Sequence, residues 1–256
     1  MRIAATTLAL FALASASAFA DLTITSKATH DGGAPQTTVS YIAGDHVRMS
    51  QPDGKEVMVD FASGNFTMMD SAKKQYWVMT RADWDAMSAK MNAAMNSPEM
   101  KNLPPEVQAK MEAMMGGMMK VNVEKTGTTR TIAGYKCQEF NVTVGEFSKS
   151  TECLTEDLKM PAESWAKYKE FSDRLKTMMA ALGPMAKNLG AMQEQFKKLK
   201  GFPIATNTTV NIMGHTTTST TEVTSVKDGA IGPSVWQVPA GYTKVESPMQ
   251  KMAKSR

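Results

Sequence analysis

Methionine is the residue type whose abundance and spacing could carry chemistry in this sequence. The chain contains 23 methionines, and a dense set lies between Met87 and Met119. Three interpretations fit, in order of preference: a filled core between helices and a sheet, an adaptable groove for an apolar ligand, or thioether binding of Cu(I). Packing comes first because the methionines recur at the spacing of a buried helix face. Copper comes last because no His or Cys accompanies them, so we expect no metal site.

If the groove interpretation is right, its lining would come from large apolar residues in the first helical segment. Trp84, Met87 and Met91 recur at helical spacing. Met-x-x-Met spacing then places further sulfurs on one helix face. The residues that we expect to bind an apolar ligand are Trp84, Met87, Met91, Met111, Met115 and Met118.

The two cysteines, Cys137 and Cys153, predict a structural disulfide. A single pair in an exported protein is read first as a disulfide. A hairpin that turns at Gly145 would bring the two residues together. The preferred register uses the loop 144–146 and sets Cys137 directly opposite Cys153.

That register also places Glu139 opposite Thr151 and Asn141 opposite Lys149. A two-residue turn would instead pair Glu139 with Glu152, and like charges facing each other destabilise a sheet. Strand alternation puts both sulfurs on the face away from Phe140 and Val142. We therefore expect the disulfide to staple the sheet rather than to fill its core.

Titratable residues show no arrangement that is typical of an enzyme. The sequence lacks the Gly-x-Ser-x-Gly, His-Glu-x-x-His and phosphate-loop motifs. Its 3 histidines, His30, His46 and His215, lie in or beside separate predicted strands. We expect surface or turn roles for them, no catalytic residues and no cofactor. The formal net charge of +4 is mild, and the basic residues are scattered, so we expect no nucleic-acid binding.

The N-terminus has the three parts of a secretory signal peptide. Arg2 supplies the positive end, residues 3–14 are apolar, and Ala18-Phe19-Ala20 forms a cleavage site. The apolar stretch is shorter than the roughly 20 residues that span a bilayer, and no later segment approaches that length. We expect residues 1–20 to be removed after Ala20, which exports the mature chain.

The elements that must position these residues follow from periodicity and turn signals. Alternating strands over 22–79 precede a helical segment at 81–119, which begins with a capping box from Thr80 to Asp83. Strands return at 121–154, and a second helical segment covers 161–200. Its apolar stripe includes Met185, Leu189, Met192 and Phe196, and Gly201 has the position of a helix C-cap.

A Thr-rich hairpin and an extended piece over 233–242 complete the chain. The expected fold is α+β: a curved antiparallel half-barrel with both helical segments packed on its concave face. We expect one domain over 21–246, and a flexible tail over 247–256.

Short motifs along the mature chain resemble a known family. They are Tyr41-Ile42, Arg48, Tyr76-x-Val-Met79, Gly134-Tyr-Lys-Cys137, Gly201-Phe-Pro-Ile204 and Trp236-Gln-Val-Pro-Ala-Gly-Tyr242. In this order they resemble the exported bacterial family known as domain of unknown function 4412, which is distantly similar to the LolA/LolB-like lipoprotein carriers.

The resemblance implies a curved sheet with a helical cover, a periplasmic location and no catalytic residues. It also implies a lipid or acyl chain as the ligand between the sheet and the Met-rich helices. The alternatives are an envelope interaction module with a self-filled core, and a Met-rich copper-handling protein.

Overall fold

The computed structural model describes residues 21–51, 53–95, 97–98, 102–104, 106–107, 110, 117, 120–159, 164, 166–170, 172–173, 189–212, 214–247 and 250. Its strands are β1 (Leu22–His30), β2 (Gln36–Ala43), β3 (His46–Ser50), β4 (Lys55–Asp60), β5 (Asn65–Asp70), β6 (Gln75–Met79), β7 (Val121–Ile132), β8 (Tyr135–Val144), β9 (Ser148–Thr155), β10 (Phe202–Ile212), β11 (His215–Asp228) and β12 (Thr243–Lys244). The helices named in the figures are α1 (Arg81–Met95) and α5 (Leu189–Phe196), and η2 (Pro233–Trp236) is a short 3-10 helix.

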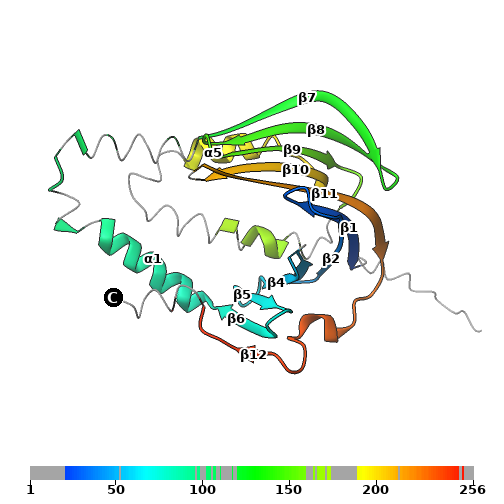
Figure 1. Ribbon diagram of the computed structural model, residues 1–256, viewed down its shortest axis with the longest axis horizontal. Helices are drawn as coiled ribbons and strands as arrows, with labels where there is room; N and C mark the ends of the chain where they lie inside the picture. Colours follow the sequence, from blue (N-terminus) through cyan, green and yellow to red (C-terminus); the bar gives the residue numbers. More distant parts are fainter. Residues whose placement is uncertain are drawn as a thin grey trace, which may run out of the picture.

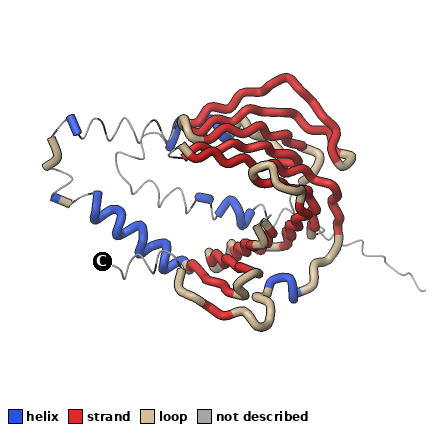
Figure 2. Tube along the Cα trace, in the orientation of Figure 1, coloured by secondary structure: helices blue, strands red, loops and turns tan. Residues whose placement is uncertain are grey.

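The strands in this part of the chain form one 12-stranded sheet in the order β12-β6-β5-β4-β3-β2-β1-β11-β10-β9-β8-β7. Neighbouring strands are antiparallel except β12 and β6, which are parallel. The order is linear, so the sheet is open. Its strands trace a C, with β7–β11 in the upper arm and β1–β6 in the lower arm (Figures 1 and 2). The predicted antiparallel sheet with helical segments is confirmed at this level.

β1 joins the two arms because it pairs with β2 on one side and β11 on the other. Its apolar and polar residues alternate, as expected for a strand with one buried face. Leu22, Ile24 and Ala28 are accordingly buried. Leu22 and Ile24 pack in a core cluster with Ile42, Ile204 and Val223, so both arms contribute to the same core.

The sheet curls strongly within its upper arm. β7 and β11 are separated by three strands, which corresponds to roughly 19 Å in a flat sheet. Nevertheless, Arg130 of β7 donates to Glu222 of β11 over 2.7 Å. The β7–β8 register also shifts between Lys125 and Thr129, and such irregularities bend and twist strands.

The register of the β8–β9 hairpin differs from the predicted one. Val144 pairs with Ser148, so the loop is 145–147, and Glu139 lies opposite Cys153. The predicted loop over 144–146 is therefore wrong. The backbone N–H of Gly145 donates to the Lys120 carbonyl over 2.7 Å, and Val144 also pairs with Val121 of β7. The neighbouring strand thus keeps Val144 in the ladder and out of the loop.

The disulfide between Cys137 and Cys153 is present, with a Cα–Cα distance of 5.3 Å. Its environment differs from the prediction. Each cysteine is only 2% exposed, and both belong to the core cluster that contains Ile204. The sulfurs do lie on the face of β8 away from Val142, but that face is also covered here. The disulfide is consequently part of the core.

Gly201 does not cap a helix, because α5 already ends at Phe196. It has a φ of +104°, and a Cβ atom at this position would lie 2.3 Å from the carbonyl oxygen of Thr155. Its role is the close approach of two backbones at the start of β10, which a residue with a side chain would prevent.

The segment 229–246, called here the C-terminal strap, crosses the lower arm. Arg48 of β3 donates to the carbonyl of Val235 over 2.6 Å and to Glu56 of β4 over 2.7 Å. The predicted extended piece over 233–242 instead begins with η2, and β12 then pairs with the edge of β6. Arg48 therefore ties the strap to the strands beneath it.

Two residues of the tail that is expected to be flexible, Ser247 and Gln250, are described by the structure. Ser247 is 2% exposed, and it exchanges hydrogen bonds with Gln250 in both directions. Gln250 also donates to Asp83 at the start of α1 over 3.2 Å. Residues 251–256 lie outside the described part of the chain. None of the helices that the structure describes is both long enough and apolar enough to span a membrane.

Candidate functional site

The helix α1 carries the part of the predicted apolar site that the structure describes. Its start is the predicted capping box: the Asp83 carboxylate accepts from the Thr80 N–H over 2.8 Å, and the Asp83 N–H donates to the Thr80 hydroxyl over 3.3 Å. Hydrogen bonds from Thr80 hold the pKa of Asp83 below its usual value, outweighing the smaller opposing effect of burial. Trp84 and Met87 follow, and both are half-buried.

The other four predicted ligand-binding residues are not placed by the structure. Met91 lies within α1, but its side chain is outside the described set. Met111, Met115 and Met118 also fall outside the described residues. The structure therefore places Trp84 and Met87 together on one helix. The other four residues of the site stay a prediction.

The helix α5 packs against β7 and covers a small valine cluster. Met192 and, just after the helix, Leu199 pack on Val121, Val123 and Val142. The predicted burial of Met192 is thus supported, whereas Phe196 from the same stripe is 41% exposed. Met185 lies outside the described residues, as does the side chain of Leu189.

One side chain of α5 and one just after it also occupy the free edge of β7. Gln195 accepts a hydrogen bond from the Val123 N–H over 3.1 Å, and Lys198 donates to the Val123 carbonyl over 3.3 Å. Unpaired edge groups otherwise recruit other strands. This contact therefore protects the edge of the sheet while it fixes the position of α5.

A polar trough of about 350 Å³ lies on the upper arm. Arg130, Glu139, Cys153 and Glu222 belong to its lining, together with asparagine and threonine side chains from β9, β10 and β11. Glu139 and Val142 differ in parity along β8, so the trough and the valine cluster lie on opposite faces of that strand. Arg130 is engaged with Glu222. Among these lining residues no His stands beside a hydroxyl, the pairing that nucleophilic catalysis uses.

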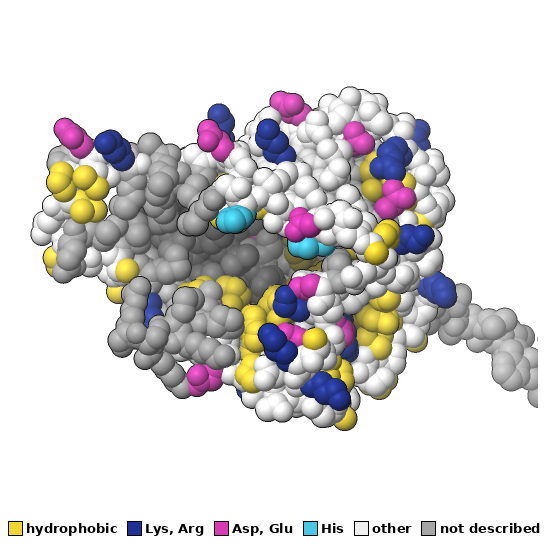
Figure 3. All heavy atoms as spheres, viewed as in Figure 1, with side chains coloured by type: hydrophobic (Ala, Val, Ile, Leu, Met, Phe, Trp, Pro, Cys, Tyr) yellow, Lys and Arg dark blue, Asp and Glu magenta, His cyan; other side chains and the backbone are white. Residues whose placement is uncertain are grey.

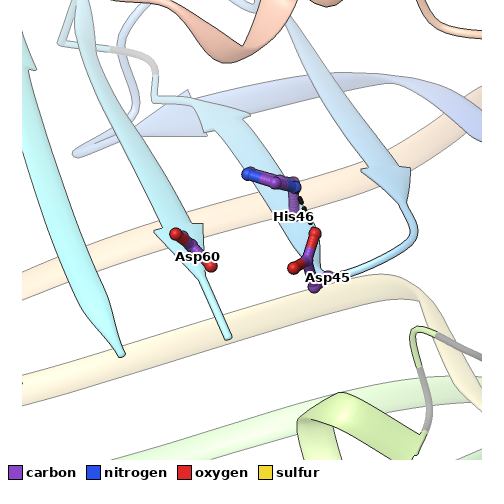
Figure 4. A group of neighbouring side chains, drawn as sticks. All are labelled: Asp45, His46 and Asp60. Atoms are coloured by element: carbon purple, nitrogen blue, oxygen red, sulfur yellow. Dashed lines mark ion pairs between the residues drawn. The ribbon is translucent and has the colours of Figure 1, made fainter. Parts of the chain in front are cut away.

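A third group combines metal-ligating side chains on the lower arm. Asp45, His46 and Asp60 each offer one donor atom, and these atoms all lie within 4.8 Å of one another. His46 and Asp60 pair across β3 and β4, and Asp45 precedes His46 (Figure 4). The surface or turn role predicted for His46 did not anticipate this group. Asp53 and Gly54, which are typical turn residues, held the signal. Antiparallel strands that fold back at this turn place residue 46 opposite residue 60.

Burial, hydrogen bonds and a nearby charge act together on the pKa of Asp60. Burial raises the pKa of its carboxyl. Hydrogen bonds from Ser63 and Ala62 and the nearby charge of His46 outweigh this, so that the pKa lies below its usual value. The Asp45 carboxylate lies 2.5 Å from Nδ1 of His46.

With the geometry described, comparison with known proteins identifies the family. The profile of a domain of unknown function, DUF4412, matches residues 24–242. The chain belongs to the DUF4412 family. Three of the motifs that carry the resemblance have structural roles in this DUF4412 chain. Arg48 holds the strap, and Gly201 permits a close backbone approach. The Trp236 ring lies against the His46 ring, with centroids 5.3 Å apart and the planes tilted by 38°.

Solved structures similar to this DUF4412 protein are distant. An uncharacterized conserved protein from Thermus thermophilus is 7% identical, with a TM-score of 0.44, and the match covers 90% of this chain and 92% of that one. The Pseudomonas aeruginosa MucA/MucB complex matches at 14% identity and a TM-score of 0.40, over 86% of this chain and 56% of that one.

A LolA superfamily protein, NE2245 from Nitrosomonas europaea, is also among the similar structures. It is 9% identical, with a TM-score of 0.18, over 85% of this chain and 89% of that one. The predicted resemblance to DUF4412 is confirmed by the family profile, whereas structural likenesses this low assign no function. The search of curated proteins gave no match.

Proposed function

We propose that this DUF4412 protein is a non-catalytic binder of an apolar ligand, a lipid or an acyl chain, held between the sheet and the Met-rich helical segments. The observation that carries the proposal is a contrast in burial. Strand residues such as Ile24 and Ile204 are at most 2% exposed. On the helical segments, Trp84 and Met87 are only half-buried, and Tyr168 and Phe196 are 42% and 41% exposed.

Apolar side chains on the helices that remain in contact with water raise the free energy of the folded protein. A ligand that covers them would lower it. Burying such a side chain contributes roughly 1.5–3 kcal/mol. Tyr168 already reaches the lower arm, where its ring meets Phe61 edge-on at a centroid distance of 6.0 Å. Figure 3 shows that this side of the molecule is hollowed between the two arms, with hydrophobic side chains gathered below the hollow. An acyl chain fits this combination of apolar contact and open access.

The proposed location is the bacterial periplasm, after removal of residues 1–20, which lie outside the described part of the chain. The buried disulfide supports this location because disulfides persist in oxidising compartments. The test is the intact mass and the N-terminal sequence of protein recovered from the periplasmic fraction. A chain that begins at Asp21 is expected, whereas a full-length chain in the cytoplasm would contradict the proposal.

Native mass spectrometry of the purified mature protein tests ligand binding. We expect co-purified lipid, and a higher melting temperature after addition of a long-chain fatty acid to delipidated protein. Trp84→Ser should reduce both effects, because it removes the largest apolar side chain described on α1. Ile212→Ser is the matched control: Ile212 is 57% exposed at the tip of the β10–β11 hairpin. A protein without lipid and without a melting response would instead favour the envelope interaction module with a self-filled core.

A further inference from the structure

The Asp45–His46–Asp60 group has the donor set of a transition-metal site. One imidazole nitrogen and two carboxylate oxygens suit Zn²⁺, which commonly takes three protein ligands and completes a tetrahedron with water. The three donor atoms lie within 4.8 Å of one another, so one ion could contact all of them after small side-chain rotations. The side chains of His46 and Asp45 are 34% and 31% exposed, which leaves a path for an ion to enter.

The charges around this group favour an added cation. Two carboxylates stand beside a single imidazole, and His46 supplies the one ion pair that either makes with the side chains the structure describes. No Lys or Arg in the described part of the chain neutralises Asp60 through an ion pair. A divalent ion would neutralise both carboxylates, and an imidazole nitrogen is the commonest metal ligand in proteins.

Residues outside the group restrict how far its members can move. The Trp236 ring packs on His46, and the strap that carries Trp236 is fixed by Arg48 through the carbonyls of Val235 and Gln237. The backbone carbonyl of Asp45 accepts from the Phe61 N–H over 2.8 Å, which joins the turn that carries Asp45 to the end of β4 that carries Asp60. Donors held by surrounding contacts bind metals more tightly than free ones.

We propose that Asp45, His46 and Asp60 form a binding site for a divalent transition-metal ion, with Zn²⁺ as the best match, at the end of the β3–β4 pair beside the strap. The site is separate from the proposed apolar site on the helices. A bound ion would sit next to Trp236, so that occupancy would couple to how the strap docks.

Zn²⁺ titration of the mature protein by calorimetry, after treatment with chelator and desalting, tests the site. We expect one ion per chain. His46→Gln and Asp60→Asn should each weaken binding by at least about tenfold, as expected when part of a metal site is removed. Asp60→Asn keeps an oxygen acceptor for the N–H groups of Ala62 and Ser63, so the turn should survive. His30→Gln is the matched control because His30 also stands beside one carboxylate, Asp31, at 3.4 Å.

Fluorescence supplies an independent readout of position. Ni²⁺, which quenches nearby tryptophans, should quench the wild type and the His30→Gln variant but leave Trp236→Phe nearly unchanged. If His46→Gln or Asp60→Asn alters the fold, Asp45→Asn replaces it, since this substitution keeps the backbone carbonyl that accepts the hydrogen bond from Phe61. Absence of Zn²⁺ uptake, or uptake that survives these substitutions, would overturn the proposal.

Discussion

The β8–β9 hairpin of the upper arm and the β3–β4 hairpin of the lower arm are both crosslinked, but over very different distances along the chain. Cys137 and Cys153 are 16 positions apart and form a covalent bond inside the core. Arg48 instead reaches the carbonyls of Val235 and Gln237, which are 187 and 189 positions away. The upper arm is therefore secured by a local bond. The stability of the lower arm depends on the docking of the C-terminal strap.

The largest effect should follow removal of the disulfide. The Cys137→Ala and Cys153→Ala double variant should lose about 3 kcal/mol of unfolding free energy, because a closed loop of this length limits the unfolded chain. Alanine is preferred to serine, since both positions are only 2% exposed. Chemical denaturation measures the loss, and reduction of the wild type should give a similar shift. An unchanged denaturation midpoint would show that the disulfide does not stabilise the upper arm.

A smaller effect should follow the loss of Arg48. Its side chain is 11% exposed and that of its partner Glu56 is 24% exposed. Arg48→Met would leave this carboxylate and two strap carbonyls without their donor. Breaking a fully buried pair costs 3–5 kcal/mol, so we expect about 2 kcal/mol here.

The part of the chain that Arg48→Met destabilises is as informative as the size of the loss in unfolding free energy. Limited proteolysis should cut the strap of Arg48→Met first, while the disulfide-linked hairpin stays protected. Lys55→Met is the matched control, because the Lys55–Asp53 pair lies on the surface and exposed pairs contribute little. Equal protease sensitivity of both arms in Arg48→Met would contradict the claim that only the lower arm depends on the strap.

The smallest effect concerns the start of α1, which Gln250 contacts from beyond the end of the strap. Asp83→Ala removes the capping carboxylate and the acceptor for Gln250, which should cost about 1 kcal/mol. Hydrogen exchange of the first turn of α1 measures it. Thr80 lowers the pKa of Asp83 in the folded protein. The stabilisation is therefore complete above the unfolded pKa of about 3.9 and is lost as the pH falls through the folded value.

The difference between wild type and Asp83→Ala should consequently shrink as the solution is acidified below about pH 4. The conservative Asp83→Asn variant retains an acceptor, so it should lose less than Asp83→Ala at neutral pH. A difference that stays constant on acidification would show that the Asp83 charge does not stabilise the cap.

The sequence alone determined the features that depend on few neighbouring residues. The strands over 22–79 follow from the alternation of apolar and polar residues and from the turn residues between them. The capping box from Thr80 to Asp83 forms as expected. The pairing of the cysteines follows from there being 2 in the chain. In each case the partners are close in sequence, or the choice of partner is already restricted.

Only the tertiary structure decided the features that depend on a third strand or on distant segments. The hydrogen bond from Gly145 to Lys120 set the β8–β9 register, and neither strand of that hairpin carries this information. The curl that brings Arg130 to Glu222 buries the cysteine face in a core that strand alternation could not reveal. Likewise, Arg48 finds its carbonyl partners only after the strap has docked. These contacts join residues that local preferences do not bring together, because their energy is gained only once the whole sheet has formed.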